Sequence, residues 1–243
     1  MGKIKILLVI LLLCAVSVNA QNTPKLSYCK ADTIPIKKDT SDFSLIVYTP
    51  VNCCFDLTAT RPDTNNSDIL FAVPAAFTAK NYKEIVGRFV GNDTIIENPT
   101  EKETGLCTIN GKNIYIGSID DSSMYYYNAL QSENTCYFQQ MLLINNGKKV
   151  ECTIFGKQKP TFRRALAQKN GKACVVESLN RMNIGDFTDM MIECGYTEAI
   201  YMDMGTWSEG FFISQSGEKT VIGPLKQNTR YQTNWLLFVA EKD

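Results

Sequence analysis

The sequence predicts an α+β fold in which a strand-rich mixed sheet with several hairpins packs against two or three helices. Asn-Gly pairs at 110–111, 146–147 and 170–171 each lie between apolar runs, and such pairs favour tight hairpins because both central turn residues need a positive φ. Two other segments have the apolar spacing of helices. The length suits a single domain over residues 21–243, or two closely joined lobes, and the single domain is the prediction.

Short apolar runs between turn signals predict the strands. They cover residues 105–109, 113–118, 140–144, 150–155, 164–168, 172–177, 211–214 and 234–240. Ser216-Gly217 is a further, weaker turn signal, and the polar stretch 61–68 predicts a surface loop.

A helix is predicted over residues 185–194, where apolar side chains recur at positions that share one helix face. These positions hold Phe187, Met190, Met191 and Cys194. Asn183 with Asp186 three residues later resembles a helix-capping pair, and Gly195 suits the left-handed residue that ends a helix. A second helix is predicted over residues 122–132. The methionine stripe is interpreted as core, not as a contact to a cofactor.

The first twenty residues have the three parts of a secretory signal peptide. Lys3 and Lys5 precede an unbroken apolar run at 6–13. Residues 18–20 (Val-Asn-Ala) resemble the small-x-small pattern that ends a signal peptide. The apolar run is shorter than the roughly 20 residues that a membrane-spanning helix needs. We therefore expect a signal peptide at 1–20, and a mature protein that is secreted or periplasmic and has no membrane span.

The balance of charge argues against a nucleic-acid partner. The chain has 25 basic and 25 acidic residues, and loss of Lys3 and Lys5 with the signal leaves 23 basic ones. No basic run supplies the positive patch that nucleic-acid binding requires.

The chain contains no histidine. This excludes Ser-His-Asp and Cys-His nucleophile systems and every metal site built on imidazole. Fingerprints of phosphate-binding loops and of dinucleotide-binding folds are also absent from the sequence, so neither a cofactor nor a metal is predicted. Any catalysis has to use carboxylates, Arg, Lys, Tyr, Ser or backbone amides.

Eight cysteines follow residue 20, and this even number permits disulfides in an exported chain. They are Cys29, Cys53, Cys54, Cys107, Cys136, Cys152, Cys174 and Cys194. A domain of this size does not depend on a disulfide framework. Cys174 and Cys194 lie in apolar surroundings, where a thiol packs as a small hydrophobe. We expect a minority of disulfide pairs and several buried thiols.

Residues 162–212 contain the most specific pattern in the chain. A strand begins at 163–165 (Arg-Arg-Ala), an Asn-Gly turn and a second strand follow, and the capped helix then leads to a strand that ends at 203–208 (Asp-Met-Gly-Thr-Trp-Ser). This order resembles the phosphodiester glycosidase family, the group of uncovering-enzyme-like domains, in which the last strand leads into an Asp-Gly-Gly-Gly-Ser turn. An upstream Asn-Gly-Gly-Phe motif of the family corresponds to residues 74–77 (Pro-Ala-Ala-Phe).

The two motifs also depart from the family pattern. The upstream asparagine and glycines are missing at 74–77, and only Asp203, Gly205 and Ser208 keep family-like character in the second motif. Glycine allows the backbone to approach a ligand closely, so its replacement narrows or refills the pocket. The implied fold tolerates these changes better than the implied activity does.

The resemblance implies cleavage of the bond between a sugar's anomeric carbon and a phosphodiester oxygen. Such a site needs an anion clamp and a carboxylate that stabilises an oxocarbenium-like centre or activates water. Asp203 is the candidate carboxylate and Arg164 the candidate clamp. Arg163 is the alternative clamp, because neighbouring strand residues point to opposite faces and only one of the two can reach the site.

Three further residues complete the substrate-binding set that the resemblance implies. Gly205 can offer backbone donors, Trp207 an apolar platform for a sugar, and Ser208 is a weaker candidate, as is Glu177 outside this set. Structural interpretations exist beside these: Asp203 as the cap of the Gly205 turn, the two arginines as solvated strand residues, and Trp207 as packing.

The leading hypothesis is an exported, glycosidase-like bacterial protein that hydrolyses a sugar-1-phosphodiester linkage in a glycan or an envelope polymer. Its expected partner is a carbohydrate or sugar-phosphate ligand. The alternative is a catalytically inactive glycan-binding or envelope-associated protein of the same fold. A third hypothesis is an enzyme that uses the same site for transglycosylation or for modification of peptidoglycan.

Overall fold

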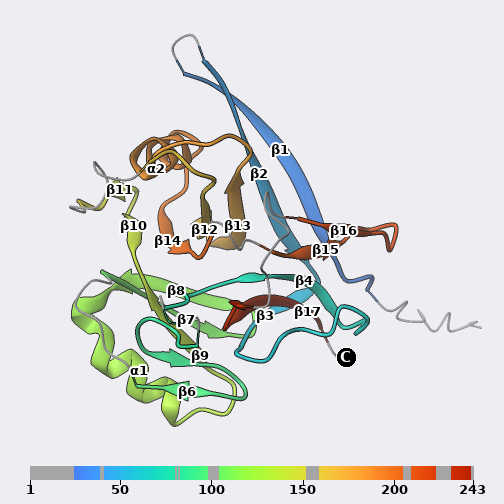
Figure 1. Ribbon diagram of the computed structural model, residues 1–243, viewed down its shortest axis with the longest axis vertical. Helices are drawn as coiled ribbons and strands as arrows, with labels where there is room; N and C mark the ends of the chain where they lie inside the picture. Colours follow the sequence, from blue (N-terminus) through green and yellow to red (C-terminus); the bar gives the residue numbers. More distant parts are fainter. Residues whose placement is uncertain are drawn as a thin grey trace, which may run out of the picture.

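Three antiparallel sheets make up most of the protein (Figure 1). The computed structural model describes residues 25–38, 41–79, 81, 83–97, 104–151, 159–204, 209–222 and 231–241. Within these ranges the helices are α1 (Ser122–Leu130), α2 (Ile184–Glu193) and a short 3₁₀ turn at Ile119–Asp121. The fold is therefore mostly β, in broad agreement with the predicted α+β class.

The first sheet has seven strands. In spatial order they are β1 (Tyr28–Lys38), β2 (Ser41–Val51), β13 (Lys172–Ser178), β12 (Arg164–Lys169), β14 (Glu198–Met202), β10 (Leu142–Asn145) and β11 (Lys148–Lys149). The hairpin of β1 and β2 extends well beyond the neighbouring strands (Figure 1).

The other two sheets have five strands each. The second contains β16 (Lys219–Val221), β15 (Phe211–Ile213), β4 (Ile69–Pro74), β17 (Trp235–Ala240) and β3 (Cys53–Thr58). The third contains β6 (Ile95–Ile96), β5 (Phe89–Val90), β9 (Cys136–Gln140), β7 (Gly105–Asn110) and β8 (Asn113–Ser118).

The predicted mixed sheet is wrong, because every strand pair among the described residues is antiparallel. The order of β13, β12 and β14 gives the reason. The chain crosses over through α2 from β13 to β14, which is the connection that parallel strands need. β12 lies between these two strands and pairs antiparallel with both, so the crossover produces no parallel pair.

Most predicted elements are present with small shifts at their ends. The turns at 146–147 and 170–171 have positive φ at both residues, as tight hairpins of this type require. At 110–111 the central residues are Gly111 and Lys112, and Asn110 pairs with Asn113 instead.

The single strand predicted over 140–144 is wrong. β9 ends at Gln140 and β10 begins at Leu142, and the two strands belong to different sheets. Side chains hold the crossing point: the Gln140 Oε1 accepts a hydrogen bond from the Met141 amide, and the Thr104 hydroxyl accepts one from the Leu142 amide. An apolar run alone does not reveal such a change of sheet.

The strand predicted over 150–155 has no counterpart in its described part, because Val150 and Glu151 lie in no strand. Its remaining residues, with Cys152, lie outside the described part of the chain. The residues predicted as a signal peptide, 1–20, also lie outside it.

α2 has the predicted capping. The Asn183 Oδ1 accepts a hydrogen bond from the Asp186 amide at 2.8 Å, and Gly195 has a φ of 85° just beyond the helix. Phe187, Met190 and Met191 are fully buried and pack on the first sheet. The methionine stripe is thus core.

The largest apolar cluster lies among the three sheets. It joins Leu166 and Val175 of the first sheet, Phe71 and Phe238 of the second, and Phe138 of the third. The other face of the first sheet packs on α2. Each strand of the first sheet therefore has one face toward the other sheets and one toward α2, and this alternation decides where its polar side chains point.

All seven cysteines that the structure describes are free thiols. Five of them are buried: Cys29, Cys53, Cys107, Cys136 and Cys174. Among these seven the expected disulfide does not occur, whereas the expected buried thiols do.

Candidate functional site

A buried ion pair lies at the start of β12. Arg164 and Glu177 are direct cross-strand partners, so both side chains point to the same face of the sheet. The Arg164 Nε donates to the Glu177 Oε1 at 2.6 Å, and the two side chains are 0% and 5% exposed. Both point toward the core among the three sheets, as Leu166 and Val175 do further along the same strands.

Asp203 follows the last residue of β14 and lies where the first and second sheets meet. Its amide donates to the carbonyl of Ala75, which directly follows β4, at 2.7 Å. Its own carbonyl accepts a hydrogen bond from the Arg164 Nη1 at 3.1 Å. The candidate clamp and the candidate carboxylate are therefore neighbours, although the guanidinium contacts the backbone of Asp203.

The segment 74–77 lies next to the Asp203 segment. The amide of Thr78, one residue further, donates to the Asp203 Oδ2 at 3.1 Å. The Asn234 side chain forms two hydrogen bonds with the backbone of Ala76, accepting from its amide at 2.7 Å and donating to its carbonyl at 3.0 Å. Ala75, Ala76 and Asn234 are fully buried, so the segment that corresponds to the family's glycine motif is closely packed.

Burial raises the pKa of the Asp203 carboxyl to about 6, against the hydrogen bond from Thr78 and the charge of Arg164, which both lower it. A carboxyl with such a pKa changes its protonation state near neutral pH. It can therefore accept or donate a proton where an ordinary carboxyl stays ionised.

Arg163 points to the opposite face, toward α2. Its Nε donates to the carbonyl of Met182 at 3.1 Å and its Nη1 to the Tyr201 hydroxyl at 3.3 Å, and its guanidinium lies over the Tyr201 ring. Arg163 is 2% exposed. Of the two arginines, Arg164 is the one that lies beside Asp203, and Arg163 holds the segment before α2.

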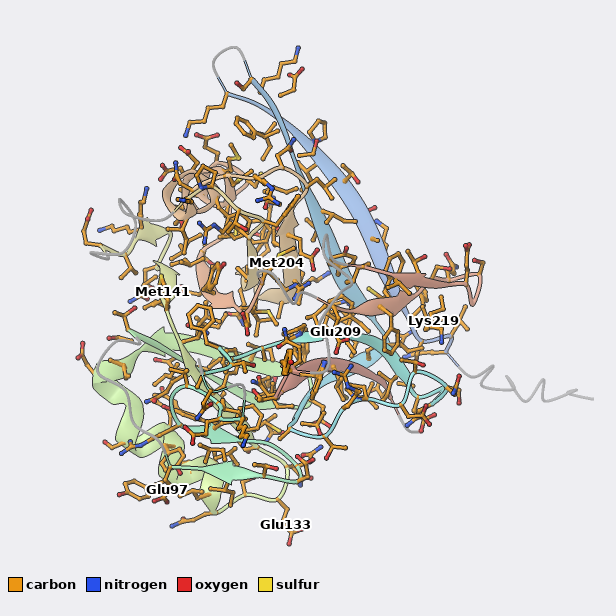
Figure 2. All side chains as sticks on the ribbon, viewed as in Figure 1. Glu97, Glu133, Met141, Met204, Glu209 and Lys219 are labelled. Carbon is orange, nitrogen blue, oxygen red and sulfur yellow. The ribbon has the colours of Figure 1, made fainter. Side chains whose placement is uncertain are left out.

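A hollow of about 470 Å³ opens beside the ion pair. Its lining includes Tyr48, Glu177, Ser178, Met204 and Ile222. Met204 follows Asp203, is buried, and lies near β12 and β13 in the view of Figure 2. The hollow gives space next to Glu177 and the Asp203 segment.

Gly205, Trp207 and Ser208 lie outside the described residues, so their proposed roles stay predictions. Within the described ranges no group of three or more Cys, Asp or Glu side chains could hold a metal ion. No helix in these ranges is both long enough and apolar enough to cross a membrane.

Two contributors to the site, Thr78 and Asn234, were not assigned from the sequence, and Glu177 was only a weak candidate there. The place of Glu177 opposite Arg164 could have been found, because a turn centred on 170–171 pairs residue 164 with residue 177. Thr78 and Asn234 reach Asp203 and its neighbours over 125 and 158 residues along the chain. Nothing in the local sequence marks such distant contacts.

The fold is similar to solved structures, whereas no protein-family model and no curated protein matches the sequence. One similar structure is the catalytic domain of zebrafish N-acetylglucosamine-1-phosphodiester alpha-N-acetylglucosaminidase, auto-inhibited by its pro-peptide. The TM-score is 0.60 at 13% identity, and the match covers 91% of this chain and 85% of the zebrafish one.

A hypothetical protein from Synechocystis has the same TM-score, 0.60, at 12% identity. The match covers 90% of this chain and 64% of the Synechocystis chain, so this protein spans less than two thirds of that one. At these identities the similarity shows the fold alone.

Proposed function

We propose that this protein is an exported hydrolase of a sugar-1-phosphodiester linkage in a glycan or envelope polymer. The observation that carries the proposal is the meeting of Asp203, Arg164 and the segment 74–77 in a fold similar to that of a phosphodiester glycosidase. The residues that the resemblance singled out come from distant parts of the chain and are adjacent in space.

In the proposed reaction Asp203 acts as a general base. Its carboxylate takes a proton from water, the water oxygen bonds to the anomeric carbon, and the bond from that carbon to the phosphodiester oxygen breaks. The electron pair of that bond leaves with the phosphate, which becomes a monoester. A phosphate is a good leaving group, so the site needs no strong general acid. The positive charge of Arg164 stabilises the phosphate.

The test is incubation of the purified protein with a panel of sugar-1-phosphodiesters, with release of the phosphomonoester as the readout. Asp203→Asn is expected to abolish turnover. Asp68→Asn, which changes an exposed carboxyl, is the matched control and should leave turnover unchanged. Absence of turnover on every substrate would contradict the proposal.

The pH dependence gives a second test. A base with a pKa of about 6 has to be ionised to accept the proton, so kcat/KM should rise with pH through about 6 and level off above it. A profile that falls over this range would show that Asp203 acts in its protonated form.

Glycan binding without turnover is the second candidate function, and one observation favours it. Arg164 is fully buried and already bound to Glu177 and to the Asp203 carbonyl. Saturable glycan binding by a protein that releases no phosphomonoester would support this function over hydrolysis.

We also propose that residues 1–20 are removed on export and that the mature protein is secreted or periplasmic. Mass spectrometry of the mature protein should find a chain that begins after Ala20. Retention of Met1 would contradict export by this signal.

A further inference from the structure

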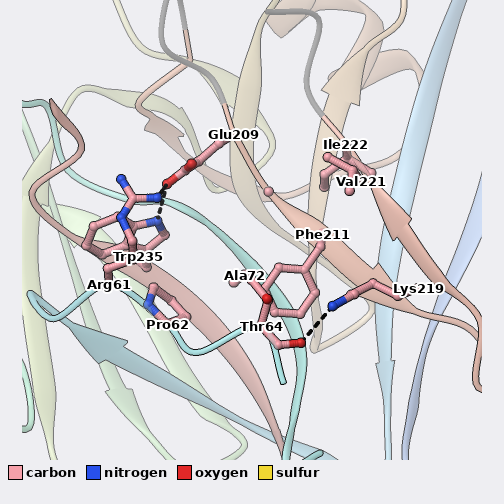
Figure 3. Close-up of a pocket in the computed structure, with 11 residues that line it drawn as sticks. Arg61, Pro62, Thr64, Ala72, Glu209, Phe211, Lys219, Val221, Ile222 and Trp235 are labelled. Atoms are coloured by element: carbon pink, nitrogen blue, oxygen red, sulfur yellow. Dashed lines mark hydrogen bonds and ion pairs between the residues drawn. The ribbon is translucent and has the colours of Figure 1, made fainter. Parts of the chain in front are cut away.

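A second cavity, of about 280 Å³, lies on the face of the second sheet that is turned away from the main core (Figure 3). Its floor consists of the buried side chains of Ala72, Phe211 and Trp235, from the neighbouring strands β4, β15 and β17. Arg61, Pro62 and Thr64 form one wall, and Lys219 and Val221 of β16 form the other with Ile222. The volume is close to the lower end of the roughly 300–1,000 Å³ that small-molecule sites occupy.

One end of this cavity carries a carboxylate with two donors. The Glu209 Oε1 accepts hydrogen bonds from the Arg61 Nη1 at 2.5 Å and from the Trp235 Nε1 at 3.3 Å. The Arg61 guanidinium also lies over the Trp235 ring, 5.2 Å from its centroid. The charge of Glu209 is therefore balanced within the cavity, and its position is fixed from two sides.

The other end carries a cation, Lys219, whose acceptor among the described residues is neutral. The Lys219 Nζ donates to the carbonyl of Thr64 at 2.8 Å and lies 5.9 Å from the centroid of the Phe211 ring. No carboxylate forms an ion pair with Lys219 in the part of the chain that the structure describes. Its hydrogen bond to Thr64 joins two exposed residues of the cavity lining, so an incoming anion can replace it.

We propose that this cavity binds a small amphipathic carboxylate, with its apolar part on Ala72, Phe211 and Ile222 and its carboxylate on Lys219. The apolar floor of the cavity can pack against the apolar part of such a ligand. The lining has two cations and one carboxylate, Glu209, which Arg61 already balances, so one negative charge on the ligand is matched by Lys219.

The covered aromatic rings argue against a sugar as the ligand here. A sugar stacks on an open ring face, whereas Arg61 lies over Trp235, Lys219 lies over Phe211, and these rings belong to residues that are 3% and 6% exposed. The cavity is thus chemically different from the proposed phosphodiester site. It shares only Ile222 with the hollow beside Glu177.

The test is isothermal titration of the unaltered protein with 4-phenylbutyrate and with the neutral 4-phenylbutan-1-ol. Saturable binding of the carboxylate is expected with a Kd below about 1 mM. Lys219→Met keeps the apolar stem and removes the charge, so it should weaken carboxylate binding about fivefold and leave binding of the alcohol unchanged. Lys172→Met, at the exposed first residue of β13, is the matched control and should change neither.

Two further variants locate the binding. Val221 is 53% exposed at the cavity wall, so Val221→Trp can narrow the cavity with little cost to folding, and it should abolish binding of both compounds. In a Trp207→Phe variant the only tryptophan left is Trp235, whose emission should change as the carboxylate binds.

Absence of saturable carboxylate binding, or equal binding by the unaltered protein and Lys219→Met, would overturn this proposal. The result does not depend on the proposed hydrolysis. The Asp203→Asn variant should bind 4-phenylbutyrate as the unaltered protein does, even where its turnover is lost.

Discussion

At the scale of single residues, folding has to bury the two opposite charges of Arg164 and Glu177. Two charges have left water, and each is tolerable only because the other lies beside it. Arg164 also holds the carbonyl of Asp203, so the pair connects the hairpin of β12 and β13 to the end of β14. Glu177 is thus a positioning residue for Arg164.

Removal of one partner should destabilise the protein strongly. Glu177→Gln removes the carboxylate that pairs with the buried Arg164 guanidinium, and we expect the free energy of unfolding to fall by about 3–5 kcal/mol. The double variant Arg164→Met with Glu177→Leu removes both charges and should recover most of that loss. Urea denaturation of the three proteins measures both effects. Equal destabilisation by the single and the double variant would contradict the idea that each buried charge is tolerated mainly because the opposite charge compensates it.

The raised pKa of Asp203 should make stability depend on pH. Its pKa in the folded state is about 6 against 3.8 in the unfolded chain, so the folded state holds this proton more tightly. The contribution to stability is complete below pH 4 and is lost as the pH rises through 6, about 3 kcal/mol in all. Asp203→Asn lacks this loss and should be more stable than the unaltered protein at pH 7 to 8, and equally stable near pH 4. Thermal unfolding at a series of pH values measures the difference.

At the scale of elements, α2 is defined by its ends as much as by its apolar face. Asn183→Ala removes the acceptor for the Asp186 amide and should lower the free energy of unfolding by about 1 kcal/mol. Asn183→Ser keeps a capping oxygen and should cost less than the alanine variant. Chemical denaturation compares the two, and an equal loss in both would show that the cap contributes through something other than this acceptor.

The elements that sequence predicts well are those whose signal is local. The turn at 170–171 sets the register of β12 and β13, and the apolar spacing of 185–194 sets α2 and its buried face. The same register places Arg164 opposite Glu177. The Arg164–Glu177 part of the candidate site thus follows from one Asn-Gly turn.

The other elements lack such a local signal, and several of them depend on partners that are distant along the chain. β1 and β2 form an eleven-residue ladder whose outer strand alternates only weakly in polarity, so it gives no clear strand pattern. The change of sheet at Met141 is held by Thr104 and Gln140, and an apolar run contains no sign of it. The contacts of Thr78 and Asn234 with the Asp203 region are of the same kind.

At the scale of the whole molecule, the three sheets share one core, so they should unfold together. Phe71 of the second sheet stacks on Phe238 at 4.3 Å and also contacts Tyr48 of the first sheet at 5.1 Å. Cys107 and Phe138 extend the same cluster into the third sheet. Among the described residues, the clusters confined to the second and third sheets are small, and the larger cluster between the first sheet and α2 lies on the other face of that sheet.

Phe71→Ala should therefore lower the stability of all three sheets at once. The side chain is fully buried, and its loss should cost about 3–5 kcal/mol. Leu179→Ala, at a position that is 47% exposed, is the control and should cost far less. Hydrogen exchange is the decisive measurement, because it follows each sheet separately. Amides of β12, β17 and β7 should lose protection by the same free energy in Phe71→Ala, whereas loss confined to β17 would show that the second sheet unfolds as an independent unit.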